Sequence, residues 1–334
     1  MLKEKIADTR QRSIFDRLGE LRIFLWLIVI ALIFSFLSPN FLNPGNLLNI
    51  AKQSSIVAIV AIGMTFVIIT GGIDLSVGSL ISFVGAVTGW VWLTTNNIFL
   101  AILAGLLTGV VAGLISGLLV GYAKLPPFIA TFGMMGAGLG LAFVLTPTSV
   151  GDFPKAFEFF GNGKIAGIPT PIILTVLLAI IAQYFLKRTR YGLRLLAIGG
   201  SEQSARLAGI DVARYTTSVY VLSGLVSAVG GLVLVARLRS AYPGAGQGYE
   251  LLVIAATVIG GVDLMGGSGS VISSIAGALL IGMIQNGLNL FGVEPFMQQI
   301  VTGCLIVIAV LANQTRGGSL WQRAWLRRAT SPQS

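Results

Sequence analysis

Two aspartates stand in matching surroundings, Gly-Gly-Ile-Asp-Leu at 71–75 and Gly-Gly-Val-Asp-Leu at 260–264. The first, Asp74, is the only charged residue between Lys52 and Lys124. A carboxylate among apolar segments can carry a coupling ion, or it can accept hydrogen bonds from the free N–H groups at the start of a helix. Because no intramembrane base accompanies either aspartate, we expect Asp74 and Asp263 to cap helices beside a pathway and to do no proton chemistry. Their expected companions in these turns are Gly71, Gly72, Ser76, Gly260 and Gly261.

Other reactive constellations are missing from the sequence. It has no histidine, and its one cysteine, Cys304, lies in an apolar run, so neither a Cys/His pair nor a metal-ligand cluster can be assembled. The phosphate-loop pattern G-x-x-x-x-G-K-[ST] does not occur; Gly-Asn-Gly-Lys at 161–164 lacks its first glycine. We therefore expect a protein that is not an enzyme, has no cofactor, and takes energy from another polypeptide or from a gradient.

The composition indicates where these residues reside. The chain of 334 residues is 55% hydrophobic and 10% charged, with a mean hydropathy of +0.89, whereas a soluble domain carries roughly a quarter charged residues. Apolar runs of about 20 residues, long enough to cross a bilayer, recur throughout. The sequence thus predicts an all-α polytopic membrane protein with about ten transmembrane helices, at 22–38, 54–71, 75–95, 98–121, 126–146, 170–187, 215–236, 247–262, 271–291 and 296–313. The span 247–262 is short and can be a broken or re-entrant helix.

The distribution of cations sets the expected orientation. Lys and Arg gather before 22, within 188–214 and after 315, which by the positive-inside rule places both termini in the cytoplasm. This divides the chain into a cytoplasmic segment 1–21, a transmembrane domain 22–314 with a cytoplasmic loop 188–214, and a basic tail 315–334. The same distribution indicates contact with membrane lipid and not with nucleic acid. Five cations fall outside: Lys52, Lys155, Lys164, Arg237 and Arg239.

The loop 188–214 contains two short amphipathic elements. Ser201 can cap a helix that starts with Glu202 and ends at Gly209, and this helix would expose Glu202 and Arg206 and turn Leu207 inward. Such elements can lie on anionic lipid or form the docking surface for a cytoplasmic partner.

One predicted helix carries glycines at strict intervals of four. This spacing lets a second helix approach backbone to backbone, and it favours a helix buried among others over one surrounded by lipid. The glycines are Gly105, Gly109, Gly113, Gly117 and Gly121. A weak internal repeat also relates the two Gly-Gly-x-Asp-Leu segments, and it relates 125–146 to 293–314.

Three motifs occur in an order that resembles the permease subunits of ribose-type ATP-binding-cassette sugar importers. They are GGIDLSVGS (71–79), GLRLLAIGGSEQSARLAGI (192–210) and YPGAGQGYELLVIAATVIGGVDLMGGSGSV (242–271). The resemblance implies a ten-helix subunit of the bacterial inner membrane that pairs as a homodimer or heterodimer. It also implies two partners, a cytoplasmic ATPase that binds the ATP and a periplasmic sugar-binding protein.

The resemblance also implies roles for particular residues. The ATPase-coupling positions would be Gly199, Gly200, Ser201, Glu202, Ala205, Arg206 and Gly209, and the binding-protein docking positions Pro243, Gly246, Gly248 and Glu250. Leu193, Leu196 and Ser201 depart from the usual residues of such permeases. The change at Ser201 preserves a helix cap, whereas Leu193 and Leu196 alter the surface expected to contact the ATPase and leave its identity open.

Alternatives remain at this point. Within the same superfamily the solute can be ribose or another pentose, a different monosaccharide, autoinducer-2, a polyol or a branched-chain amino acid. A gradient-driven secondary transporter is the alternative of another class, and it would need a membrane-embedded ion site.

Overall fold

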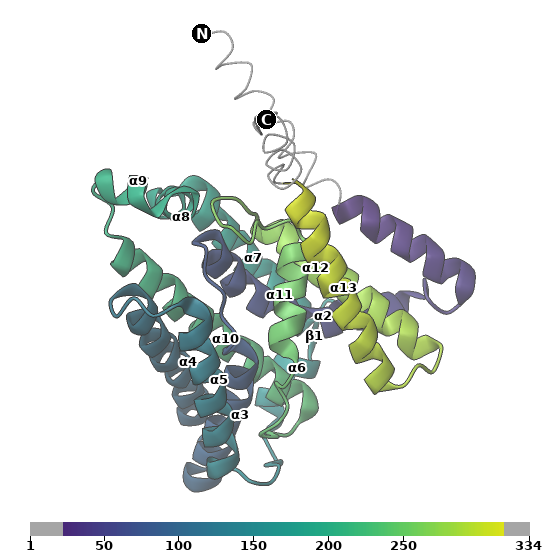
Figure 1. The fold of residues 1–334 in the computed structure, drawn as a ribbon. Coiled ribbons are helices and arrows are strands. Elements are labelled where there is room, and N and C mark those ends of the chain that lie inside the picture. Colours follow the sequence, from purple (N-terminus) through teal and green to yellow (C-terminus); the bar gives the residue numbers. More distant parts are fainter. Residues whose placement is uncertain (1–22, 317–334) are drawn as a thin grey trace.

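The computed structural model describes residues 23–316 and shows a helical bundle with one short hairpin (Figure 1). The helices are Ile23–Leu37, α2 Pro44–Ile69, α3 Val77–Thr95, α4 Ile98–Gly121, α5 Pro127–Leu145, α6 Lys155–Asn162, α7 Thr170–Arg188, α8 Arg190–Gly200, α9 Glu202–Leu207, α10 Val212–Leu238, α11 Tyr249–Ile259, α12 Val271–Leu290 and α13 Pro295–Arg316. The antiparallel strands β1 Lys164–Ile165 and β2 Ile168–Pro169 form the hairpin.

The polytopic all-α prediction is confirmed, and each of the ten predicted spans contains a helix. Within the described residues, seven helices are long and apolar enough to cross a membrane. The terminal segment 1–21 and nearly all of the tail 315–334 lie outside the described part of the chain. The end of α13 lies at the same end of the molecule as α8 and α9 (Figure 1).

The second helix starts earlier than the apolar run indicates, at Pro44 and not at 54. The Asn43 side chain accepts a hydrogen bond from the Gly45 amide, and Pro44 occupies the first helical position, where a missing N–H costs nothing. The Asn-Pro pair was therefore the start signal. Its consequence is that Lys52 lies inside α2 rather than in a loop.

Two helices form the centre of the bundle. The most apolar window of α2 is 89% buried and that of α10 is 78% buried, whereas the figures for α4, α5 and α7 are 28%, 22% and 28%. The outward faces of these three helices expose large apolar side chains such as Leu103, Phe132 and Ile180. Such a surface is suited to lipid or to another membrane subunit.

The glycine stripe of α4 packs against α10, as its spacing predicts. A Cβ added to Gly109 would lie 2.4 Å from the carbonyl oxygen of Gly224. A Cβ added to Gly113 would lie 2.4 Å from the carbonyl oxygen of Tyr220. Gly117 and Gly121 meet α10 in the same way, while Gly105 faces Thr88 of α3. The expectation that α4 is buried against other helices holds for its glycine face, whereas its leucines remain exposed on the opposite side.

The segment 247–262 does not span as one helix. The helix α11 has 11 residues, which at 1.5 Å per residue is about half of the roughly 30 Å hydrocarbon core. The preceding loop runs along α3, where the Gly246 amide donates to Ser82 Oγ at 2.9 Å. This crossing therefore consists of an entering loop followed by a half-length helix.

Candidate functional site

The first Gly-Gly-x-Asp segment forms the break between α2 and α3. Gly71 adopts φ +80°, and the Gly72 amide donates to the Val67 carbonyl at 3.0 Å, which ends α2. The side chain of Asp74 follows and is 2% exposed. One carboxylate oxygen accepts from both the amide and the hydroxyl of Ser76, and the other accepts from Ser223 Oγ of α10 at 2.7 Å.

These contacts give Asp74 a structural role that differs in one respect from the expected cap. It bonds the amide of Ser76, the residue before α3, and so holds the turn into that helix. Its second bond ties the break to the middle of α10, and the partner Ser223 was missed because a single serine in an apolar helix carries no distinctive pattern. The carboxylate of Glu250 also faces the first turn of α3, where the helix dipole favours negative charge, since a Cβ on Gly78 would lie 1.9 Å from Glu250 Oε2.

The second segment forms the break between α11 and α12, and its geometry is different. Asp263 is partly exposed, and its carboxylate accepts one hydrogen bond, from the Met265 amide at 2.9 Å. The helix α12 begins only at Val271, so Asp263 does not cap it. The expectation that both aspartates behave alike is wrong, because the intervening glycines and serines lengthen this turn. Gln183 Oε1 of α7 accepts a hydrogen bond from the Val271 amide at 3.0 Å and so satisfies one of the free N–H groups at the start of α12.

The two breaks meet each other at the end of α8. The Gly267 amide of the second break donates to the Ile69 carbonyl at the end of α2, at 2.9 Å. A Cβ on Gly199 would lie 1.8 Å from that carbonyl oxygen and 2.3 Å from the Gly267 nitrogen. A Cβ added to Gly266 would lie 3.0 Å from the Gly71 nitrogen and 3.1 Å from the Gly199 Cα. We call this contact of Gly71, Gly199, Gly266 and Gly267 around the Ile69 carbonyl the glycine junction.

The junction brings together residues from three distant parts of the sequence. Gly71 and Gly199 were candidates from the sequence, whereas Gly266 and Gly267 were only part of the third motif, 242–271, and were not assigned a role. The backbone of Gly200, the next residue after Gly199, also lies against Gly267, but a Cβ added to Gly200 itself would point away and have nothing within 4 Å. Gly72, Gly260 and Gly261 shape the turns; a Cβ on Gly72 would lie 2.5 Å from the hydroxyl of Tyr220.

Helix α8 is anchored firmly to the bundle. Its apolar face buries Leu195 and Ile198, and the Tyr191 hydroxyl hydrogen-bonds Ser218 Oγ of α10 at 2.7 Å. Burial raises the pKa of the Tyr191 hydroxyl, so this group stays protonated. Arg194 bonds the Tyr215 hydroxyl and lies over the ring, 5.6 Å from its centroid. These contacts fix α8 against α10 beside the junction at its end.

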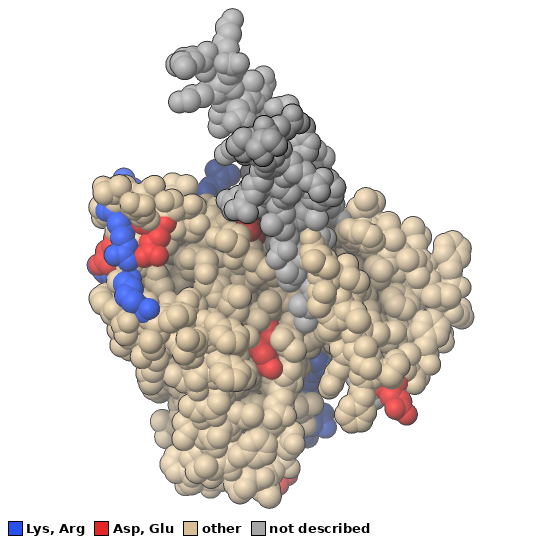
Figure 2. Space-filling view, viewed as in Figure 1, with Lys and Arg blue, Asp and Glu red and all other residues tan. Residues whose placement is uncertain are grey.

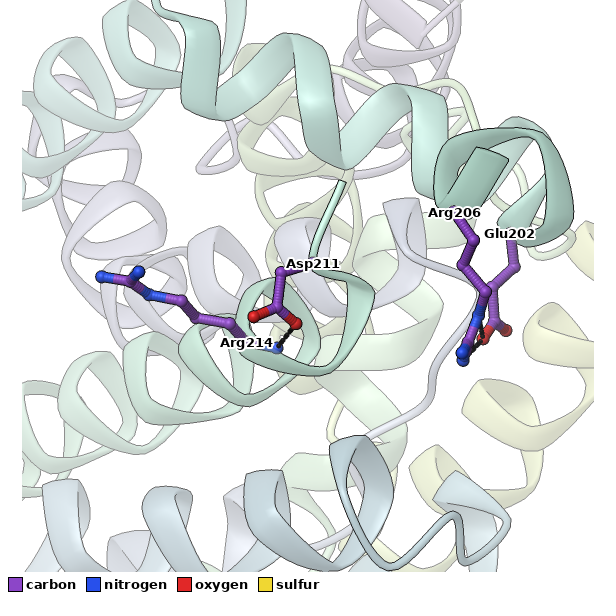
Figure 3. Close-up of polar contacts among 4 residues, drawn as sticks. All are labelled: Glu202, Arg206, Asp211 and Arg214. Carbon is purple, nitrogen blue, oxygen red and sulfur yellow. Dashed lines mark hydrogen bonds and ion pairs between the residues drawn. The ribbon is translucent and has the colours of Figure 1, made fainter. Parts of the chain in front are cut away.

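Helix α9 follows at once, and Ser201 caps it by accepting from the Ser204 amide at 3.2 Å. Glu202 and Arg206 form an exposed ion pair, and Asp211 accepts from the Arg214 amide at 3.1 Å to begin α10 (Figure 3). Gly209 lies in the turn between α9 and α10. Figure 2 shows blue and red side chains next to one another at the upper left corner of the molecule, where Figure 1 places α9.

The face of α9 that packs on the bundle is the opposite of the one predicted, which contained Leu207. Ala205 is buried against Ile198 and Val212, whereas Leu207 is 84% exposed. Residues two apart on a helix point about 200° away from each other, so only one of them can face the bundle. The small alanine allows α9 to lie close to α8. Leu207 and Leu193, which is 62% exposed, therefore present apolar side chains on the outward face of this segment.

The proposed docking positions in the loop 237–250 are mostly covered. Pro243 and Gly246 are buried, Glu250 is turned toward α3, and only Gly248 is exposed. A Cβ on Gly246 would lie 2.1 Å from the Gly78 carbonyl oxygen, so this part of the loop fits tightly against α3.

Comparison with known proteins places this architecture in a family. The family model described as "Branched-chain amino acid transport system / permease component" matches residues 46–310. The chain belongs to this permease family. No solved structure matches it.

Similar permeases carry sugar-transport names. The ribose import permease protein RbsC of Bacillus subtilis (strain 168) is 43% identical over 95% of this chain and 99% of its own length. The ribose import permease protein of Escherichia coli (strain K12) is 42% identical over 87% and 92%. The L-arabinose transport system permease protein AraH of the same strain is 39% identical over 90% and 91%. With its apolar helices, the chain is a multi-pass membrane permease.

Proposed function

We propose that this permease is the membrane subunit of an ATP-binding-cassette importer that passes a monosaccharide, of the ribose or pentose type, into the cytoplasm. Family membership and the sugar-transport names of its relatives support the substrate class. A single observation carries the mechanism, namely the glycine junction, where α8 contacts the breaks before both α3 and α12 without any intervening side chain.

A cytoplasmic ATPase would bind the outward face of α8 and α9. This face offers the exposed apolar side chains of Leu193 and Leu207 beside the Glu202–Arg206 pair. The sequence has no phosphate loop, and in this proposal the partner binds the ATP. A displacement of α8 is passed on at the junction because close-packed backbones cannot absorb it by changing rotamers.

The remaining assembly follows from the same proposal. The subunit resides in the bacterial inner membrane, with α8 and α9 facing the cytoplasm, and pairs with a second copy or a related permease. The sugar arrives from a secreted binding protein on the opposite side. Asp74 shapes the pathway by holding α3 to α10 and does not couple transport to an ion, since both of its oxygens already accept hydrogen bonds.

Reconstitution into vesicles tests this function directly. The permease together with its ATPase and binding protein should accumulate labelled ribose or another monosaccharide only when ATP is supplied, and the permease alone should move no solute uphill. Arabinose, allose, a polyol, autoinducer-2 and valine serve as competing solutes. ATP-independent accumulation driven by an ion gradient, or uptake of valine in preference to every sugar, would contradict the proposal.

The docking face is tested by ATPase pull-down. The double change Glu202→Ala with Arg206→Ala, and separately Leu207→Asp, should reduce capture of the ATPase at unchanged permease levels. Phe99→Ala provides the control, because this exposed side chain lies at the start of α4, and it is the opposite end of that helix, at Gly121, that lies beside Arg206. Equal loss of capture in the control would contradict the assignment of this face.

A further inference from the structure

A group of cations lies where α2, α10 and the hairpin meet, at the opposite end of α10 from α8 and α9. Arg237, Lys164 and Arg239 lie close enough to Lys52 for their charges to repel that of its ammonium group. These are four of the five cations that the sequence assigns to the outer side. We call them the outer cation cluster.

The cluster is built on specific contacts. Lys52 Nζ donates to Asn162 Oδ1 at 2.8 Å, and Asn162 Nδ2 donates to the carbonyls of Ala236 and Arg237, each at 3.0 Å. Gly161 makes this close approach possible, since a Cβ there would lie 2.2 Å from the Arg237 nitrogen. The residue Asn162 thus fixes the outer ends of α2, α6 and α10 relative to one another.

The positive charge of the cluster is poorly compensated within the protein. Arg239 Nε pairs with Glu158 Oε2 at 2.9 Å. Among the described residues, Lys52, Lys164 and Arg237 form no ion pair with a carboxylate. Lys164 and Arg239 are exposed, and Lys52 and Arg237 are partly exposed. The arrangement concentrates like charges that only an external anion can neutralise.

The position of the cluster distinguishes between two sources of negative charge. Lipid head groups surround the rim of a membrane protein, and the rim is formed by helices that are little buried, such as α4, α5 and α7. Three of the four cations, Lys52, Arg237 and Arg239, instead lie at the outer ends of α2 and α10, the two most buried of the long helices, and Lys164 joins them from the hairpin that precedes α7. A partner approaching from the aqueous side meets these charges directly.

We infer that the outer cation cluster is a docking surface for an acidic face of the secreted binding protein. This inference rests on the proposed function, which supplies the partner and the orientation. The sequence placed binding-protein docking at positions that include Pro243 and Gly246, which are largely covered. The inference assigns docking to the neighbouring hairpin and the end of α10. Charges at the edge of an interface mainly accelerate association and make it sensitive to salt.

The test measures binding of the solute-binding protein that supports uptake in the vesicle assay to the complete importer in nanodiscs of neutral lipid. Lys164→Glu should weaken binding about threefold to tenfold, mainly through slower association, and should flatten the dependence on salt. Lys155→Glu is the matched control, because Lys155 is an exposed cation in the first turn of α6 that is not among the charges acting on Lys52. It should leave binding within about twofold, as expected for a charge outside the interface.

Three results would overturn the inference. Equal effects of the two substitutions, or binding that does not change with salt, would show that the cluster does not dock the partner. A requirement for anionic lipid in the nanodiscs that Lys164→Glu removes would assign the cluster to lipid. These results differ from failure of the proposed function, in which the unaltered importer would take up no sugar with any binding protein.

Discussion

The two Gly-Gly-x-Asp breaks begin with nearly identical sequences and are built differently. In the first, Asp74 is buried and accepts hydrogen bonds from its own turn and from α10, and α3 starts three residues later. In the second, Asp263 is partly exposed, its carboxylate accepts a hydrogen bond from the Met265 amide, and α12 starts eight residues later. The first break is therefore clamped to the bundle, whereas the second is a longer loop whose glycines lie against α2 and α8. A shared motif ends a helix in both places, and its surroundings decide what the aspartate does.

This difference suggests that the two breaks have different roles. The clamped break holds α3 in place, while the looser break can respond to movement of α8 through Gly266 and Gly267. Both breaks touch α8 through the glycine junction, so a substitution there affects both at once. Substitutions in a single break separate their roles.

The largest effect is expected at Gly199. A Cβ there meets two backbone atoms that cannot rotate away, so Gly199→Ala should push α8 off both breaks and lower ATP-driven uptake at least about tenfold, as a displacement on the order of 1 Å does at other positioned sites. Gly200→Ala, one residue further, meets nothing within 4 Å and should keep uptake near normal. Uptake and ATP hydrolysis measured in the same vesicles check this, and equal behaviour of the two variants would remove the junction from the coupling path.

The clamped break should depend strongly on its carboxylate. Asp74→Ala leaves two buried hydroxyls and an amide without their acceptor, and an unsatisfied buried group costs about 1–3 kcal/mol, so the melting temperature in detergent should fall clearly. Asp74→Asn keeps one acceptor oxygen and should retain most transport. Complete loss of transport in the Asn variant, at normal membrane levels, would instead indicate that the charge itself is needed.

The looser break should tolerate the corresponding change. Asp263→Ala removes one hydrogen bond at a partly exposed turn, worth about 0.5–1.5 kcal/mol, and the melting temperature should fall less than for Asp74→Ala. The same thermal scans compare the two variants side by side. An equal or larger fall for Asp263→Ala would contradict the distinction between the breaks.

The smallest effect on stability is expected on the exposed face of α9. The Glu202–Arg206 pair is solvent-exposed and four residues apart, an arrangement worth about 0.3–0.5 kcal/mol, so the double alanine variant should melt almost as the unaltered protein does. Any loss of ATPase capture by this variant then reports docking rather than folding. A marked loss of stability would show that the pair supports the fold of the segment.

The sequence by itself determined the membrane class, the ten helical segments and the glycine face of α4. The length of an apolar run decides whether a helix can span the bilayer, and the spacing of glycines decides which face can pack closely. Both are local properties of the sequence. It also predicted the cap at Ser201, whose hydrogen bond reaches only three residues along the chain.

Only the tertiary structure decided which residues that are distant in sequence contact one another. Ser223 beside Asp74, Gln183 at the start of α12, the glycine junction and the gathering of Lys52, Lys164, Arg237 and Arg239 each join residues far apart in sequence. The outward side of Leu207 was decided in the same way, by the fit of Ala205 against α8 and α10. Such contacts depend on how helices cross and how closely backbones approach, and a single sequence does not encode that geometry in any local pattern.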